Sequence, residues 1–158
     1  MSLREVQTSA ARVVQVDRLN DRAVQELKAR FRYHPLDIEA LFSVPLNPSF
    51  SSYGDYSFVT LLWPNVKIGD TSELRFFIDH KQLTIIGDTP QHDFRKFVAE
   101  LHQHLGSRES QYTAPELFHE ILHRLRGAWS GSAVVMTATI ASRLSANAQV
   151  IRQLGRWL

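Results

Sequence analysis

Hydrophobic and polar positions follow two different periods along this chain, and the two periods predict strands and helices in a mixed order. Runs of β-branched and aromatic residues between turn formers predict strands at residues 11–16, 56–63, 73–79 and 82–87. Apolar residues that recur every three or four positions predict helices at residues 20–31, 35–42, 90–105 and 113–126, and a last helix from Ser132 to the end. This order is typical of an α/β domain, with α+β as the alternative, in which helices pack on a mixed central sheet.

Turn-forming residues set the expected limits of several of these elements. Residues 47–55 are rich in Ser, Pro, Gly and Asn and predict a loop. Pro64 is expected to end the strand before it, since proline donates no hydrogen bond to a sheet. Only His80 and Lys81 separate the last two strands, which is the spacing of a hairpin. The apolar stripe of the final helix continues to Leu158, so we expect a helix that is cut there rather than finished.

Composition restricts the class of protein. A chain of 158 residues fits one domain, and the absence of cysteine excludes disulfides and Cys-ligated metal centres. No apolar run is long enough to span a bilayer. All acidic residues lie at or before Glu120, whereas five arginines and no acid follow it. These arginines are sparse and are not interleaved with aromatic residues, so we expect no nucleic-acid partner.

Residues 119–123 read His-Glu-Ile-Leu-His, the pattern of a zinc peptidase helix. In that chemistry His119 and His123 bind the metal and Glu120 is the general base. A catalytic zinc needs three protein ligands, yet residues 124–158 contain no Asp, Glu or His. The upstream candidates for the third ligand are His92, His102 and His104. A zinc hydrolase is therefore the lesser alternative, and we expect no enzyme.

Helical register favours a simpler interpretation of the same segment. Its apolar face is formed by Phe118, Ile121, Leu122 and Leu125, which leaves both histidines on the wetter side. No glycine-rich phosphate loop and no G-x-S-x-G elbow is present either. The carboxylates of Asp37 and Glu39 are two positions apart, so on a helix they point to different faces.

Three segments follow one another along the chain, namely LKARFRYHPLDIEALF, SSYGDYSFVTLLWP and ELRFFIDHKQLTIIGD. Taken in this order, they resemble the N-terminal cytosolic domain of the CorA-type magnesium and divalent-cation transporters. The matching positions are Phe31, His34, Pro35, Leu36, Glu39, Tyr53, Asp55, Tyr56, Phe76, Phe77, Leu83 and Ile85. The resemblance covers most of residues 11–130, and PELFHEILHRLRGAW looks like the helix that precedes the long stalk of the family.

The resemblance implies a funnel domain over residues 1–130 and the beginning of a stalk helix over 131–158. It implies a cytosolic regulatory and assembly domain of a homopentamer that gates ion transport. Such a domain lies on the cytoplasmic side of the cell membrane, anchored by C-terminal transmembrane helices that this sequence lacks. The pore motif Gly-Met-Asn is absent as well, so this chain alone cannot conduct ions. A free-standing CorA-like binding module without a pore is the alternative.

The metal implied by the resemblance is a weakly bound Mg²⁺, or Co²⁺ or Zn²⁺ in related branches. Family members carry Glu-Asp in the short helix after His-Pro-Leu, where this chain has Glu39 and Ala40. Alanine cannot bind a metal, so the resemblance selects Glu39 as a metal ligand. Local chemistry adds Asp37, since Mg²⁺ prefers carboxylate oxygens and retained waters.

Overall fold

The computed structural model describes residues 3–16, 19–42, 48–65, 70–87, 112–132 and 148–154, together with Glu100 and Gln103. Six strands form one sheet in the order β1-β2-β6-β5-β4-β3. Their bounds are Leu3–Gln7 (β1), Arg12–Val16 (β2), Ser49–Ser52 (β3), Ser57–Asn65 (β4), Asp70–Ile78 (β5) and Gln82–Gly87 (β6). Only β2 and β6 pair in parallel; every other neighbouring pair in this sheet is antiparallel.

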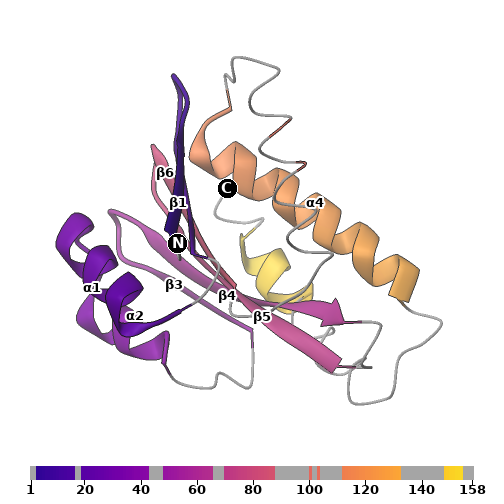
Figure 1. Ribbon diagram of the computed structural model, residues 1–158. Coiled ribbons are helices and arrows are strands. Elements are labelled where there is room, and N and C mark those ends of the chain that lie inside the picture. Colours follow the sequence, from indigo (N-terminus) through magenta and orange to yellow (C-terminus); the bar gives the residue numbers. More distant parts are fainter. Residues whose placement is uncertain are drawn as a thin grey trace.

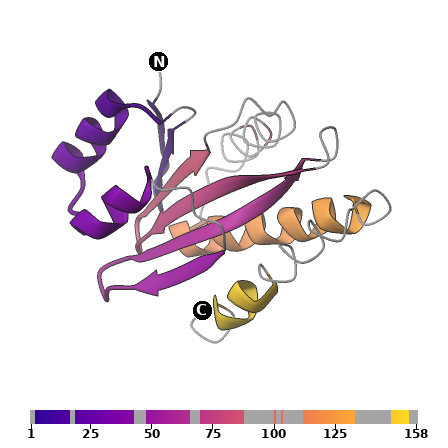
Figure 2. The ribbon, with the colours of Figure 1, turned by 90° about the horizontal axis from the view of Figure 1, so that it is seen from below.

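Helices cover both faces of the sheet (Figures 1 and 2). The helices are Asp21–Arg30 (α1), Pro35–Ala40 (α2) and Ala114–Ser132 (α4), and residues 148–154 are also helical. α1 and α2 lie on one face, and α4 lies on the other with the helical turn at 148–154. The expectation of an α/β fold with a mixed sheet is therefore confirmed. None of the helices in these ranges combines the length and apolar character that crossing a bilayer requires.

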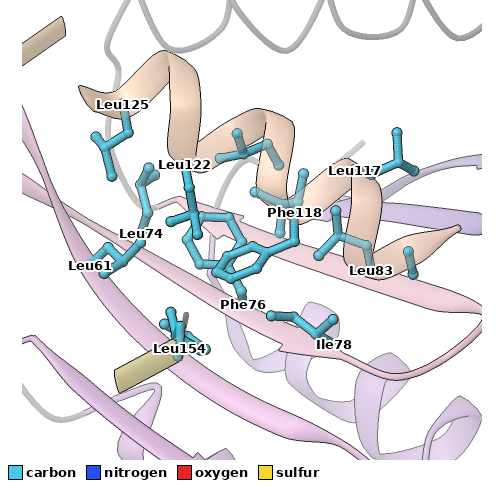
Figure 3. Close-up of a cluster of buried hydrophobic side chains, with 14 of the residues drawn as sticks. Leu61, Leu74, Phe76, Ile78, Leu83, Leu117, Phe118, Leu122, Leu125 and Leu154 are labelled. Carbon is cyan, nitrogen blue, oxygen red and sulfur yellow. The ribbon is translucent and has the colours of Figure 1, made fainter. Parts of the chain in front are cut away.

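The face under α4 holds the larger apolar core (Figure 3). Phe118 projects from α4 onto Phe76 of β5, with ring centroids 5.0 Å apart and planes at 63°. The inward residues of α4 are Leu117, Phe118, Ile121, Leu122 and Leu125, and all are buried. The helical register expected from the sequence is confirmed, because His119 and His123 are exposed on the opposite side.

The other face holds a second core in which side chains of α1 and α2 meet aromatic rings of the sheet. Leu27 of α1 and Ile38 of α2 are buried there against Phe58 and Phe77. The strands contribute to both cores because successive side chains point to opposite faces. The sheet is thus buried on both sides, as the continuous apolarity of β4 indicates.

Two edge strands differ from the expectations. The sequence predicts no strand at β1, and it predicts a loop where β3 forms. β3 pairs with β4 from Ser49↔Thr60 to Ser52↔Ser57, so backbone pairing at a sheet edge overrides the turn-forming composition. The turn between them contains Gly54 at φ +83, a backbone conformation that glycine adopts without strain.

Pro64 does not end β4, which continues to Asn65 and pairs with β5 as far as Asn65↔Asp70. The prediction was wrong because it did not consider where β3 ends. β3 pairs with one edge of β4 only as far as Thr60, so Pro64 lies beyond β3. The missing N–H of Pro64 therefore costs no hydrogen bond between β3 and β4.

The remaining differences concern the helices. α4 is longer than the predicted 113–126 and includes Ser132, which the sequence assigns to the start of the last helix. Of that last helix, residues 133–147 and 155–158 lie outside the described residues. The predicted helix over 90–105 is represented by Glu100 and Gln103, both helical, and its other residues also lie outside.

Candidate functional site

The short helix α2 is held at both of its ends by side chains from other positions. At its start, Nδ1 of His34 accepts a 3.2 Å hydrogen bond from the backbone N–H of Leu36, which caps the helix, and Pro35 occupies the first turn. Just after its end, the buried Arg75 of β5 donates from Nη1 to the carbonyl of Leu41 at 2.6 Å. A cation at a helix C-terminus also complements the helix dipole. The position of α2 on the sheet is therefore fixed.

Asp37 lies at the centre of a polar cluster, the Asp37 cluster, formed with His34, Tyr53 and Tyr56. Its carboxylate is buried and accepts two hydrogen bonds, 2.8 Å from the Tyr53 hydroxyl and 2.6 Å from the Tyr56 hydroxyl. The Tyr56 oxygen in turn accepts a 2.6 Å hydrogen bond from the backbone N–H of His34. A buried carboxylate needs such donors, so the cluster joins α2 to the turn between β3 and β4.

Stacked rings extend this cluster into the sheet. The ring of Tyr53 lies parallel to His34 at 5.4 Å on one side and stacks on Tyr56 at 5.1 Å on the other. Tyr56 meets the edge of Tyr33, which stacks on Phe77 at 3.9 Å. The aromatic side chains therefore form one connected series from the surface to the core.

The Tyr33 hydroxyl is also held by polar side chains of β6. Nε2 of Gln82 donates to the Tyr33 oxygen at 2.8 Å, and Oγ1 of Thr84 lies at the same distance from it. Tyr33 belongs to the connection between α1 and α2. These bonds therefore tie that connection directly to the sheet.

The three tyrosines of this region are held in their neutral form. Burial is the main cause that raises the pKa of Tyr33 to about 12, and burial together with the hydrogen bond to Asp37 raises that of Tyr56 further still. The hydrogen bond to Asp37 is the main cause that raises the pKa of Tyr53. All three hydroxyls consequently keep their protons to a higher pH than an ordinary tyrosine does.

The surface around α2 is unusually apolar. We call this surface the α2 face and define it by Leu36, Glu39, Phe42 and Tyr53. Among the described residues only four large hydrophobic side chains are exposed, and three of them belong to this face: Leu36 at 63%, Phe42 at 55% and Tyr53 at 42%. Glu39 is exposed beside them. Exposed apolar residues that gather in one place mark an interaction site more often than scattered ones do.

The structure places the two predicted metal ligands in different environments. Asp37 is 4% exposed, and each carboxylate oxygen already accepts a tyrosine O–H, whereas Glu39 is exposed. Mg²⁺ keeps several waters in an octahedral shell and is bound through accessible carboxylates. Asp37 does not fit that chemistry, and Glu39 supplies one accessible carboxylate. Nowhere in the described ranges do three or more His, Cys, Asp or Glu residues gather closely enough to hold a metal.

The HEILH segment lies on α4, and its two histidines are exposed. Glu120, the candidate general base, forms an ion pair of 3.6 Å with Arg124, which also pairs with Glu100 at 3.3 Å. The other candidate ligands His92, His102 and His104 lie outside the described residues. No third ligand is brought to the pair by the part of the chain that the structure describes.

Sequence reasoning missed the role of three residues of the site. Tyr53 and Tyr56 were noted only as part of a family pattern with Asp55, yet both tyrosines contact Asp37 whereas Asp55 is exposed. Arg75 was missed entirely. The available signal was a lone arginine inside the apolar run Leu-Arg-Phe-Phe, because a charged residue at a buried strand position requires a specific partner.

Comparison with known proteins gives matches at the level of structure alone. No protein-family model matches the sequence, and no curated protein matches it. Among solved structures, the cytoplasmic domain of ZntB from Vibrio parahaemolyticus is 17% identical with a TM-score of 0.63, over 79% of this chain and 50% of that one. The CorA magnesium transporter of Methanocaldococcus jannaschii is 15% identical with a TM-score of 0.61, over 81% of this chain and 41% of that one.

The full-length CmaX protein is a third similar structure. It is 21% identical with a TM-score of 0.59, over 77% of this chain and 38% of that one. The chain therefore spans half or less of the length of each of these three proteins. At such low identity the likeness shows a shared fold, and the fold is the one that the CorA-type resemblance predicts.

Proposed function

We propose that this chain is the cytosolic regulatory and assembly domain of a CorA-type divalent-cation transporter. The observation that carries the proposal is the fold, which is shared with a ZntB cytoplasmic domain and with CorA over about four fifths of this chain. In this proposal the domain lies on the cytoplasmic side of the cell membrane. It acts in assembly and gating, without catalysis, in a homopentamer.

The α2 face is the surface that we assign to contact between copies. It presents Leu36, Phe42 and Tyr53 to solvent, and its exposed charges, Glu39 and the neighbouring Asp55, are acidic. The chain from Ile121 onward contains five arginines and no acidic residue. An acidic, apolar face on one copy complements this basic segment on the next. Contact between two different surfaces generates a ring when the rotation between copies closes, as a pentamer requires.

Divalent cations regulate this assembly in our proposal through Glu39. A single exposed carboxylate binds Mg²⁺ weakly, and because the basic segment offers no carboxylate, the remaining ligands in our proposal are water and backbone carbonyl oxygens of the neighbouring copy. Mg²⁺ at such a site shifts the equilibrium between two arrangements of the copies only if it binds one arrangement more tightly than the other. Asp37 contributes by fixing α2, since its carboxylate is occupied by Tyr53 and Tyr56.

Two measurements test the assembly proposal. Sedimentation equilibrium of the chain with and without millimolar Mg²⁺ is expected to show Mg²⁺-dependent association, and Glu39→Gln is expected to abolish the Mg²⁺ effect.

The chain has no cysteine, so a single Phe42→Cys or Arg22→Cys variant gives a unique reporter. Maleimide labelling at position 42 is expected to slow on association, whereas labelling at the exposed position 22 on α1 is expected to stay fast. A monomer under all conditions would contradict the proposal.

The transport role has a separate genetic test. The reading frame past the codon for Leu158 is expected to continue through a long helix into two apolar segments with Gly-Met-Asn between them. A frame that stops at Leu158 would exclude a pore in this protein. The free-standing binding module would then take its place.

A further inference from the structure

We infer that His119 and His123 form a two-histidine site for a borderline transition-metal ion such as Zn²⁺ on the outer face of α4. This inference does not depend on the transport proposal. It starts from a feature that the proposed function leaves unused, namely two histidines that are both exposed on the side of α4 opposite its apolar core.

The spacing of the two histidines supports chelation. Residues four positions apart on a helix are neighbours, with Cβ atoms about 5–6 Å apart. α4 runs without interruption from Ala114 to Ser132, so this spacing is fixed by a regular backbone. The helix is anchored below by buried residues such as Phe118 and Ile121. Both imidazoles are thus presented together by a rigid support, which favours binding of one ion by two nitrogens.

The type of donor selects the ion. Imidazole nitrogen suits Zn²⁺, Cu²⁺ and Ni²⁺, whereas Mg²⁺ requires hard oxygen donors. Zinc adopts four-coordinate geometry, so two histidines leave two positions for water. This is a binding site with open positions and not a catalytic centre, because no third protein ligand lies near it among the described residues.

The charges around the histidines favour a divalent cation. Glu120 lies between them and pairs with Arg124, which also pairs with Glu100. Glu116 lies one turn before His119. The backbone N–H and the hydroxyl of Thr113 donate to its carboxylate and lower its pKa, so it is ionised.

Arg126 follows the pair by one turn and is the second cation that the described residues place there. Within the described part of the chain, these three carboxylates and two guanidinium groups leave a local net charge of −1. The surroundings therefore attract a divalent ion weakly and do not repel it.

The experiment is a calorimetric titration of the full chain with ZnCl₂ and, separately, with MgCl₂. A second ligand held beside the first raises affinity by about 100-fold, so His119→Gln or His123→Gln is expected to weaken Zn²⁺ binding by about that factor. His80→Gln removes another exposed histidine and is the matched control, expected to leave the affinity unchanged. MgCl₂ is expected to show no dependence on the histidine pair.

A rescue variant tests the spacing itself. Gly127 is exposed, and a Cβ added there meets no atom within 4 Å. His119→Gln combined with Gly127→His therefore places a new pair at positions 123 and 127, again four apart, and is expected to restore binding. Equal Zn²⁺ affinity of the wild type and of His119→Gln/His123→Gln would overturn the inference. A rescue variant that is folded by circular dichroism but binds no better than His119→Gln would overturn it as well.

Discussion

The hydroxyl of Tyr56 donates a 2.6 Å hydrogen bond to the buried carboxylate of Asp37. This contact joins the short helix α2 to the start of β4. It also explains how a surface with exposed Leu36 and Phe42 stays fixed in place. The carboxylate holds α2 against the sheet, and the apolar residues beside it remain available for a partner.

Replacement of Asp37 is expected to destabilise the fold. Asp37→Ala leaves the buried Tyr56 hydroxyl without its acceptor and removes a second bond from Tyr53. Hydrogen bonds to a charged group contribute about 1.5–3 kcal/mol, so we expect a loss of about 2–3 kcal/mol in urea-induced unfolding. The matched control is Glu39→Ala on the exposed side of the same helix, expected within about 0.5 kcal/mol of wild type. Equal urea midpoints for Asp37→Ala and wild type would show that the bonds contribute nothing.

Arg75 is expected to be as important as Asp37. It is buried, donates to the Leu41 carbonyl at 2.6 Å and forms an ion pair with Glu73 at 2.8 Å. Arg75→Ala is expected to cost about 3 kcal/mol, since it breaks a partly buried ion pair and leaves that carbonyl without this donor. Arg75→Lys is expected to recover only part of the loss, because lysine lacks the planar fork that serves two partners.

The measurement for Arg75 is amide hydrogen exchange. Faster exchange is expected in α2 and at Phe42, whose N–H bonds to the carbonyl of Glu39. The amides of α4 lie on the other face of the sheet and serve as the internal reference. Uniform acceleration across both faces would indicate global unfolding and would argue against a local clamp.

The contact between Phe118 and Phe76 is expected to dominate the attachment of α4. Phe118 is fully buried, and its ring lies 5.0 Å from that of Phe76. Phe118→Ala is expected to cost about 3–5 kcal/mol, the range for large-to-small changes in a core. Phe42→Ala provides a control with the same chemistry at a site that is 55% exposed, where we expect a change within about 0.5 kcal/mol. Thermal unfolding of the two variants compares them directly.

Alkaline pH is expected to destabilise the protein through Tyr33. Its pKa rises from about 10 in the unfolded chain to about 12 in the folded protein, chiefly through burial. The folded state therefore holds its proton longer, and the stabilisation is complete below pH 10 and is lost as the pH rises through 12. Urea unfolding between pH 8 and pH 11 is expected to show falling stability above about pH 10.

The matched variant for this pH dependence is Tyr33→Phe. It keeps the ring that stacks on Phe77 and removes the group that titrates. Its stability is expected to fall less steeply above pH 10 than that of wild type. Identical slopes for the two proteins would assign the alkaline loss to other groups, of which the buried Tyr56 is the first to examine.

Periodicity predicted the elements whose side chains enter a core. The register of α4 and the bounds of β6 follow from the sequence because burial of one face imposes the pattern directly. β3 could not be predicted in this way. Its residues Ser49–Ser52 lack the pattern of a strand and are extended because β4 offers hydrogen-bonding groups along its edge.

The sequence predicts where the candidate site lies along the chain but not which of its side chains contact one another. The short helix after His34 was expected, and so was its start at Pro35. The burial of Asp37 was not, because it depends on tyrosines sixteen and nineteen positions away along the chain. Contacts between residues so far apart along the chain depend on tertiary packing, and a local sequence pattern does not predict them.

The parallel pairing of β2 with β6 also determines when the domain can fold. Its first register partners, Arg12 and Gln82, are seventy positions apart. Closing such a long loop costs chain entropy before the contacts between the two strands stabilise the fold. Folding is therefore slow. While the ribosome is synthesising the chain, β1 and β2 can pair only with each other until β6 emerges. The inner edge of the amino-terminal hairpin therefore stays unpaired until almost all of the sheet has been synthesised.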